Sequence, residues 1–214
     1  MHMRARIEGG VVHSPYADCP PLDGTSTSAF LMERLLRHGS KTAVLCGHEK
    51  LTYLELRERL QLCAAKLQRE GVGPGARVYA HVGNSISSLV AVCSIPLTGA
   101  TLVTSDCMLP EDEILDRAAR AAATHVLTDA GHAGQFSRVE GRCKIKGFLL
   151  LDESGPGFRN ASRLYSGDDL SSQDLDFTTA GCCRFVNWST GTTGAAKCVE
   201  IPESRFLRQI VCRE

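Results

Sequence analysis

The sequence has no excess of charge of either sign. Its 214 residues include 24 Lys or Arg and 24 Asp or Glu, so the formal net charge is zero. A neutral chain lacks the general electrostatic attraction that draws proteins to nucleic acid or to anionic lipid. Apolar residues at 43% and charged residues at 22% are ordinary for a globular protein and disfavour a disordered or collagen-like chain. We therefore expect a folded domain that does not bind nucleic acid.

Long apolar runs are also missing. The first ten residues hold no apolar stretch of the kind found in signal peptides. No segment approaches the roughly 18 apolar residues that a membrane helix requires. The ten cysteines include no C-x-x-C pair, and no two histidines lie three to five positions apart, as a zinc site would need. We expect reduced thiols, a cytoplasmic location, no transmembrane segment and no protein-held metal site.

The order of the expected elements indicates the fold class. Helices of ten or more residues alternate with short β-branched strands, which predicts βαβ units and a mainly parallel sheet in an α/β fold. Two irregular segments are expected, an extended lead-in over residues 12–28 and a long surface loop over 152–180. Expected strands cover 42–46, 50–53, 77–82, 101–105, 124–128, 147–151, 183–188 and 199–201. Expected helices cover 29–39, 54–70, 85–98 with an early end at Pro96, a segment from Pro110, one between 128 and 147, and one from Pro202.

Residues 188–199 carry the chemistry that the sequence makes visible. They read W-S-T-G-T-T-G-A-A-K-C-V and follow an expected strand. Glycines let backbone N–H groups approach an anion, hydroxyls donate hydrogen bonds, and Lys197 adds a positive charge, which together suit a phosphate group. This is not a Walker A loop, because another strand follows it before any helix. A Ser/Thr/Gly-rich hairpin loop with a solvated lysine is the alternative reading.

The same segment resembles the phosphate loop of the AMP-forming adenylate synthetases, which include acyl-CoA synthetases, 4-coumarate–CoA ligases and firefly-luciferase-like proteins. Their loop reads aromatic-(S/T)-S-G-(S/T)-T-G-x-P-K-G-V. This chain departs from it at three positions, where Thr190 replaces Ser, Ala196 replaces Pro and Cys198 replaces Gly. The first change keeps a hydroxyl donor, and the other two alter loop stiffness and backbone approach.

Other segments resemble the same family in the same order. L-T-Y-L-E-L at 51–56 matches the family's L-T-Y-x-E-L, and G-P-G-A-R-V at 73–78 resembles the turn before its next strand. L-P-x-x-E-I at 109–114 resembles a further motif, and S-P-Y at 14–16 resembles the first segment of the 4-coumarate ligase and luciferase branch. The resemblance therefore covers nearly the whole chain.

The resemblance implies an acid–thiol ligase. Family members join a carboxylic acid to AMP at the expense of Mg·ATP, release pyrophosphate, and pass the acyl group to a thiol, usually that of coenzyme A. It implies no catalytic residue and no protein-held metal in this segment. It implies that seven residues contact the ATP phosphates: Ser189, Thr190, Gly191, Thr192, Thr193, Gly194 and Lys197.

The resemblance also sets an expectation about organisation. We expect a lead-in over residues 1–28 and an incomplete AMP-binding domain over 29–214, ending soon after the phosphate loop and without the C-terminal lid domain. Such a chain would be inactive alone, and a longer form could be peroxisomal. Two alternatives stay open: a non-catalytic short form that binds nucleotide or a protein partner, and an unrelated α/β domain with a hairpin loop. The activated acid and the oligomeric state are not readable from these residues.

Overall fold

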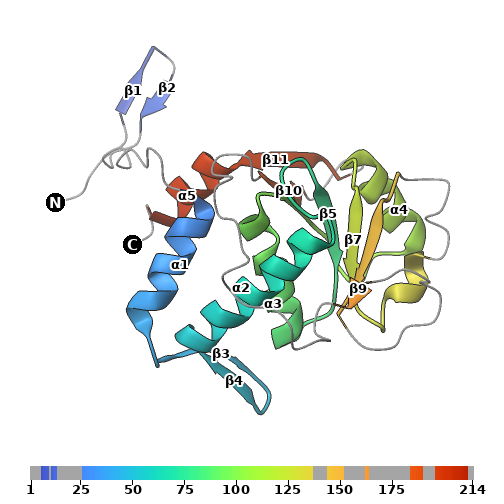
Figure 1. Cartoon of the computed structure of the whole chain (residues 1–214). Helices are drawn as coiled ribbons and strands as arrows, with labels where there is room; N and C mark the ends of the chain where they lie inside the picture. The colour runs from blue at the N-terminus through green and yellow to red at the C-terminus, as the bar shows by residue number, and fades with distance from the viewer. Residues whose placement is uncertain are drawn as a thin grey trace.

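A seven-stranded β-sheet organises the computed structural model (Figure 1). The structure describes residues 6–9, 11–13, 26–136, 144–151, 162–163, 184–189 and 196–211. The strands of the sheet are β5 (Arg77–His81), β6 (Thr101–Thr104), β7 (His125–Thr128), β8 (Gly147–Leu150), β9 (Ser162–Arg163), β10 (Arg184–Trp188) and β11 (Cys198–Pro202). Their order across the sheet is β11-β10-β6-β5-β7-β8-β9, and only β11 runs antiparallel to its neighbour. The predicted α/β fold with a mainly parallel sheet is confirmed.

Helices cover both faces of this sheet. They are α1 (Thr27–His38), α2 (Tyr53–Arg69), α3 (Ile86–Ser94), α4 (Glu111–Arg120) and α5 (Glu203–Val211), with 3₁₀ turns η1 (Pro96–Thr98) and η2 (Ala133–Phe136). Two antiparallel strand pairs lie outside the sheet: β1 (Arg6–Glu8) with β2 (Val11–His13), and β3 (Thr42–Cys46) with β4 (Glu49–Thr52). Figure 1 shows α2 and α3 on one side of the sheet and α4 on the other.

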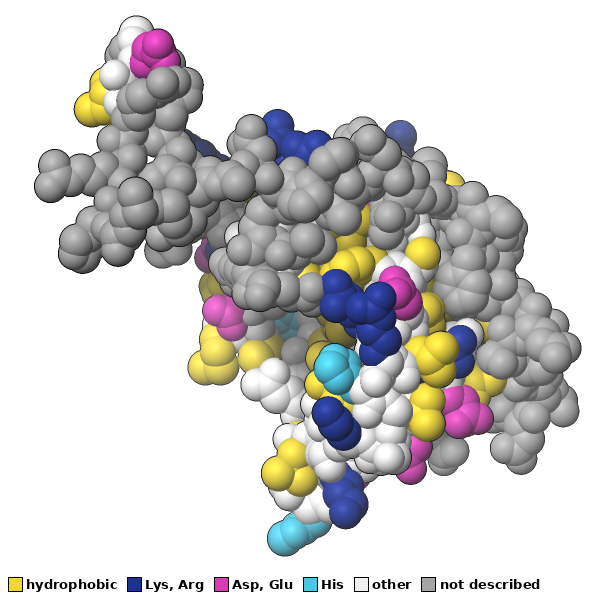
Figure 2. All heavy atoms as spheres, turned by 90° about the vertical axis from the view of Figure 1, so that its left-hand side faces the viewer, with side chains coloured by type: hydrophobic (Ala, Val, Ile, Leu, Met, Phe, Trp, Pro, Cys, Tyr) yellow, Lys and Arg dark blue, Asp and Glu magenta, His cyan; other side chains and the backbone are white. Residues whose placement is uncertain are grey.

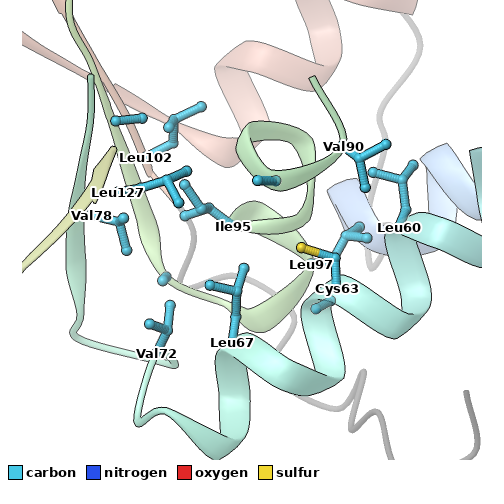
Figure 3. Packing of buried hydrophobic residues seen from close by; sticks show 14 of the residues in the cluster. Leu60, Cys63, Leu67, Val72, Val78, Val90, Ile95, Leu97, Leu102 and Leu127 are labelled. Carbon is cyan, nitrogen blue, oxygen red and sulfur yellow. The ribbon is translucent and has the colours of Figure 1, made fainter. Parts of the chain in front are cut away.

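Alternation along the strands divides the core into two clusters. In β5, Val78 and Ala80 pack in the cluster that contains α2 and α3, whereas Tyr79 between them packs in the cluster that contains α4. Successive strand residues point to opposite faces, so a strand with helices on both sides is apolar throughout. Figure 3 shows the first cluster, where Leu67 of α2 lies toward Ile95 and Leu60 of the same helix lies beside Val90 of α3. These two leucines are seven residues apart and therefore share one helix face.

The ends of α2 follow from its sequence. The Thr52 hydroxyl accepts a hydrogen bond from the Glu55 N–H at 3.2 Å, and the Glu55 carboxylate accepts one from the Thr52 N–H at 2.8 Å. This reciprocal capping box satisfies two N–H groups that the first turn would otherwise leave unpaired. Gly71 follows the helix with φ of 82°, a conformation that glycine adopts without a Cβ clash. The sequence therefore sets both ends of the helix expected at 54–70.

Several boundaries differ from the expectations. Helix α1 begins before residue 29, because the side chain of Ser26 accepts from the Ala29 N–H and caps it. Pro96 ends α3 early, as expected, and the chain continues as η1. Between residues 128 and 147 the described part holds only the 3₁₀ turn η2, and residues 137–143 lie outside it. The expected loop over 152–180 contains the short edge strand β9, whose parallel pairing to β8 has no local sequence signal.

On the face in Figure 2, Lys and Arg side chains gather near the centre, and acidic and apolar side chains are scattered around them among the described residues. The presence of both signs of charge agrees with the zero formal net charge of the whole sequence. In the described part of the chain, no helix combines the length and apolar character needed to cross a bilayer.

Candidate functional site

The carboxyl edge of the sheet is where topology favours a site. Strands β5 and β7 are neighbours. After β5 the chain continues to β6 on one side of this pair, and after β7 it continues to β8 on the other side. Strands β6 and β10 are also neighbours. After β6 the chain continues to β7 on one side of them, and after β10 it continues to β11 on the other side. Diverging connections open a crevice at the carboxyl ends of two neighbouring parallel strands, and ligands of open α/β sheets bind at such points. This edge therefore has two candidate crevices, at β5/β7 and at β6/β10.

The β6/β10 crevice lies beside the sequence motif. Strands β10 and β11 form an antiparallel hairpin in which Trp188 pairs with Cys198. Beyond that pair, the Ser189 N–H donates to the Lys197 carbonyl and the Lys197 N–H donates to the Ser189 hydroxyl, both at 3.0 Å. A hydroxyl that accepts a hydrogen bond can still donate its own O–H proton to another group. The structure thus brings the first and last predicted phosphate-binding residues together.

The remaining predicted phosphate-binding residues lie outside the described part of the chain, so their role stays a prediction. They are Thr190, Gly191, Thr192, Thr193 and Gly194. The second reading of this segment, a Ser/Thr/Gly hairpin loop, is compatible with the hairpin itself. The hairpin connection alone therefore does not decide between a structural loop and a phosphate site.

A pocket of about 500 Å³ opens next to the hairpin. The ends of β6 and β10 supply its walls, and α4 adds one arginine. Its lining residues are Thr104, Ser105, Asp106, Arg117, Asn187, Trp188 and Ser189. The lining combines the Arg117 guanidinium and the Asn187 amide with the Asp106 carboxylate, while the Thr104 hydroxyl already donates to the Val186 carbonyl at 3.0 Å. This lining suits a polar ligand better than an apolar one.

Trp188 is held at one wall of this pocket by several groups. Its indole N–H donates to the Thr104 carbonyl at 2.9 Å. The guanidinium carbons of Arg117 and Arg120 lie 5.1 Å and 5.3 Å from the ring centroid. Both distances are within the range of cation–π attraction. Arg120 also donates to the Ala196 carbonyl at 2.6 Å, so α4 touches the chain on both sides of residues 190–195.

A buried polar chain lies beneath the pocket. Ser105 Oγ lies 2.8 Å from the Tyr79 hydroxyl and 2.8 Å from His81 Nδ1, and His81 Nε2 lies 2.7 Å from Gln135 Oε1. His81 is fully buried. Burial lowers the pKa of His81 and raises the pKa of Tyr79 to about 12, so both groups are neutral at pH 7. Because the Ser105 hydroxyl donates to the Tyr79 hydroxyl, its Oγ is left to accept a hydrogen bond from His81 Nδ1.

At the second crevice, β5/β7, the protein's own polar groups are hydrogen-bonded to one another. Asp129, directly after β7, accepts from the Gly83 N–H at 2.7 Å and from the His132 N–H at 3.0 Å. Its other contact is His132 Nδ1 at 2.6 Å. Burial alone would raise the pKa of Asp129, but the hydrogen bonds from Gly83 and His132 outweigh it and lower that pKa. A Cβ at position 83 would lie in contact with this pair, 3.4 Å from His132 Cε1 and 3.5 Å from the Asp129 carboxylate.

Sequence reasoning missed the residues that surround the motif. Nothing in the sequence links Arg120 to the hairpin, because 76 positions separate it from Ala196. The polar groups His81 and Asp129 did carry a signal, because each ends or follows an expected strand and parallel strands align their carboxyl ends. In the portions described, no group of three His, Cys, Asp or Glu side chains has the arrangement of a metal site.

Comparisons with known proteins agree on one family. The family profile described as AMP-binding enzyme matches residues 31–212. The aldehyde reductase lnaA of Aspergillus flavus is 26% identical over 201 residues, which cover 94% of this chain and 18% of that protein. A dimodular nonribosomal peptide synthase of Bacillus subtilis is 26% identical over 173 residues, which cover 80% of this chain and 7% of that protein. The chain therefore spans a small part of these relatives.

Solved structures share the fold at lower identity. An anthranilate CoA ligase in complex with anthranoyl-AMP has a TM-score of 0.69 at 18% identity, covering 84% of this chain and 35% of that chain. A long-chain-fatty-acid-CoA ligase of Archaeoglobus fulgidus has a TM-score of 0.63 at 16% identity, covering 88% and 39%. At such identities the likeness shows the fold alone, which is that of the N-terminal part of adenylating domains.

Proposed function

Because this chain belongs to the AMP-binding enzyme family, we propose that it carries the site for the ATP phosphates in an enzyme that converts a carboxylic acid to an acyl-adenylate. The observation that carries the proposal is the match of residues 31–212 to the AMP-binding enzyme profile, and the structure supports it at one point. Ser189 and Lys197, the first and last residues of the predicted phosphate loop, are hydrogen-bonded to each other at the carboxyl edge of the sheet. A Ser/Thr/Gly loop that begins and ends there can aim N–H and O–H groups at one anion.

In the proposed reaction a negatively charged carboxylate approaches a negatively charged phosphate, so the site must offset their repulsion. A carboxylate oxygen bonds to the α-phosphorus of ATP, the bond from that phosphorus to the β-phosphate oxygen breaks, and pyrophosphate leaves. Donors placed around the β- and γ-phosphates stabilise the charge that accumulates on the leaving group. Ser189 would donate its O–H proton, and Lys197 would add a positive charge. Mg²⁺ would enter as part of the Mg·ATP substrate.

Five further residues share this proposed role by sequence. They are Thr190, Gly191, Thr192, Thr193 and Gly194. Their hydroxyl and backbone N–H groups are the donors that a triphosphate requires at close range. The pocket beside Ser189 is a suitable place for the rest of the nucleotide or for the acid, because its lining is polar.

We propose coenzyme A as the thiol that takes the acyl group. The solved structures that share this fold include ligases named for CoA, which supports this choice. A second candidate is adenylation within a peptide synthase, supported by the 26% identity to the dimodular nonribosomal peptide synthase. An assay for the CoA thioester separates the two. Thioester formation favours the first candidate, and adenylate formation without transfer to CoA favours the second.

The test of the phosphate site is a calorimetric titration of the 214-residue chain with Mg·ATP. We expect saturable binding, and we expect Lys197→Ala to weaken it about tenfold, since a hydrogen bond to a charged group contributes about 1.5–3 kcal/mol. Lys50→Ala is the matched control, because Lys50 is an exposed lysine on β4, away from the hairpin. No binding at millimolar ATP, or equal affinity in Lys197→Ala, would overturn the proposal.

A further inference from the structure

Two arginines of α4 hold the only tryptophan of the chain. Arg117 and Arg120 are three residues apart, so they lie on one face of the helix. Their guanidinium carbons are 5.1 Å and 5.3 Å from the centre of the Trp188 ring. The indole N–H is fixed on the Thr104 carbonyl at 2.9 Å, which orients the ring. We call Arg117 and Arg120 the arginine clamp.

Arg120 also reaches the opposite end of the loop. Its Nη2 donates to the Ala196 carbonyl at 2.6 Å. Trp188 comes directly before Ser189, and Ala196 comes directly before Lys197. Arg120 therefore contacts both Trp188 and Ala196, which directly precede the first and last residues of the proposed phosphate loop.

The chemistry of these contacts requires arginine. A guanidinium is planar, so it can lie against an aromatic ring while its N–H groups donate in the plane to a carbonyl. A lysine ammonium could keep the charge near the ring, but it has no planar fork to fill both roles. Each clamp residue is also oriented on α4 itself, Arg117 by Glu113 at 2.5 Å and Arg120 by Asp116 at 3.2 Å. The clamp is thus held before any ligand arrives.

We propose that Arg120, assisted by Arg117, is a positioning residue that fixes Ser189 and Lys197 in the arrangement that binds the phosphate groups of the nucleotide. This inference rests on the proposed function. Holding both ends of a loop in the free protein removes part of the ordering cost that a phosphate ligand would otherwise have to meet. The clamp acts through Trp188 and Ala196 and need not touch the nucleotide.

The test compares substituted forms of the 214-residue chain with the wild type. Arg120→Ala removes the contacts to Trp188 and Ala196, whereas Arg120→Lys keeps the charge. Asp116→Asn removes the ion pair of Arg120 and leaves its hairpin contacts in place. Arg37→Ala is the matched control, because it removes an exposed arginine that pairs with Glu33 four residues earlier, far from the hairpin.

Two measurements read the effect. Acrylamide quenching of Trp188 fluorescence reports the clamp directly, because the chain has one tryptophan. Titration with pyrophosphate reports the phosphate site, and thermal unfolding shows that each variant is folded. We expect Arg120→Ala to expose Trp188 to quenching and to weaken pyrophosphate binding about three- to tenfold, the range of a lost charged hydrogen bond. Arg120→Lys should be intermediate, Asp116→Asn should have a smaller effect, and Arg37→Ala should match the wild type.

The outcomes separate the clamp from the proposed function. If the wild type binds pyrophosphate and Arg120→Ala binds it with the same affinity, the clamp is overturned and the proposed function stands. No pyrophosphate binding by the wild type would overturn the proposed function, and unchanged quenching in Arg120→Ala would then overturn the clamp as well. Equal losses of affinity in Asp116→Asn and Arg120→Ala would show that Arg120 acts only through α4, which also contradicts the clamp.

Discussion

The two crevices at the carboxyl edge of the sheet have similar topology but differ in the polar groups that line them. At β5/β7, Asp129 joins Gly83 and His132 through hydrogen bonds of 2.6–3.0 Å, so its carboxylate is engaged within the protein. At β6/β10, the strand ends leave a pocket of about 500 Å³ beside Ser189. Diverging connections thus open a crevice, but the side chains after each strand decide whether it becomes a site.

The polar groups at the two crevices also have different partners. The Asp129 cluster and the chain through His81 satisfy each other inside the protein, which is the usual state of buried polar groups. Around β6/β10, the Ser189 hydroxyl can still donate its own O–H proton, and the two arginines of α4 support the chain on either side of the loop. We therefore expect substitutions at the first group to change stability and those at the second to change ligand binding.

The largest expected effect is on the buried histidine. His81→Ala should lower the free energy of unfolding by about 2–4 kcal/mol, because it leaves a cavity and deprives Ser105 and Gln135 of a partner. Urea unfolding followed by circular dichroism measures the loss. His81→Gln can still accept and donate, so it should lose less than half as much. A loss below about 0.5 kcal/mol in His81→Ala, the size of an ordinary surface substitution, would show that the chain does not stabilise this edge.

Asp129→Ala should have a somewhat smaller effect. It removes a carboxylate that accepts three hydrogen bonds, and a charged hydrogen bond contributes about 1.5–3 kcal/mol. The same urea experiment measures stability, and titration with Mg·ATP measures affinity. We expect lower stability and unchanged affinity, since the Asp129 carboxylate is engaged with Gly83 and His132 at the other crevice. Reduced ATP affinity at unchanged stability would reverse the assignment of the two crevices.

The smallest expected effect is a dependence of stability on pH. Burial lowers the pKa of His81 and of His125 in the folded protein. The unfolded chain, with an ordinary histidine pKa of about 6.5, then binds protons that the folded protein does not. The contribution is complete above pH 6.5 and declines as the pH falls below it, by at most about 1.4 kcal/mol per pH unit for each histidine.

Urea unfolding at pH 7.5, 6.5 and 5.5 checks this dependence. His81→Gln should flatten it, because a glutamine does not titrate. Asp129 acts in another window: its lowered pKa stabilises the folded protein above about pH 4, the ordinary pKa of an aspartate, and this contribution is lost as the pH falls below it. Equal slopes in the wild type and His81→Gln between pH 7.5 and 5.5 would contradict a neutral buried His81.

The sequence carried much of the fold and one part of the site. Alternation of short strands with amphipathic helices predicted the parallel sheet, and the Thr52–Glu55 capping pattern lies at the start of α2. The edge strand β9 was not predicted, because two residues paired to β8 leave no periodic pattern. Residue order predicted Ser189 and Lys197 as phosphate contacts; the structure places them next to each other, and their role stays a prediction. The contact of Arg120 with Ala196 was not, because it depends on how α4 packs against β10 and β11.

Hydrogen–deuterium exchange with and without Mg·ATP compares the two crevices in one experiment. If the phosphates bind at β6/β10, amides near Ser189 and Lys197 and at the end of β6 should exchange more slowly with ATP, and those around Gly83 and Asp129 should not change. Lys197→Ala should remove this protection. Protection confined to Gly83 and Asp129, or no protection at millimolar ATP, would contradict a phosphate site at the β10–β11 hairpin.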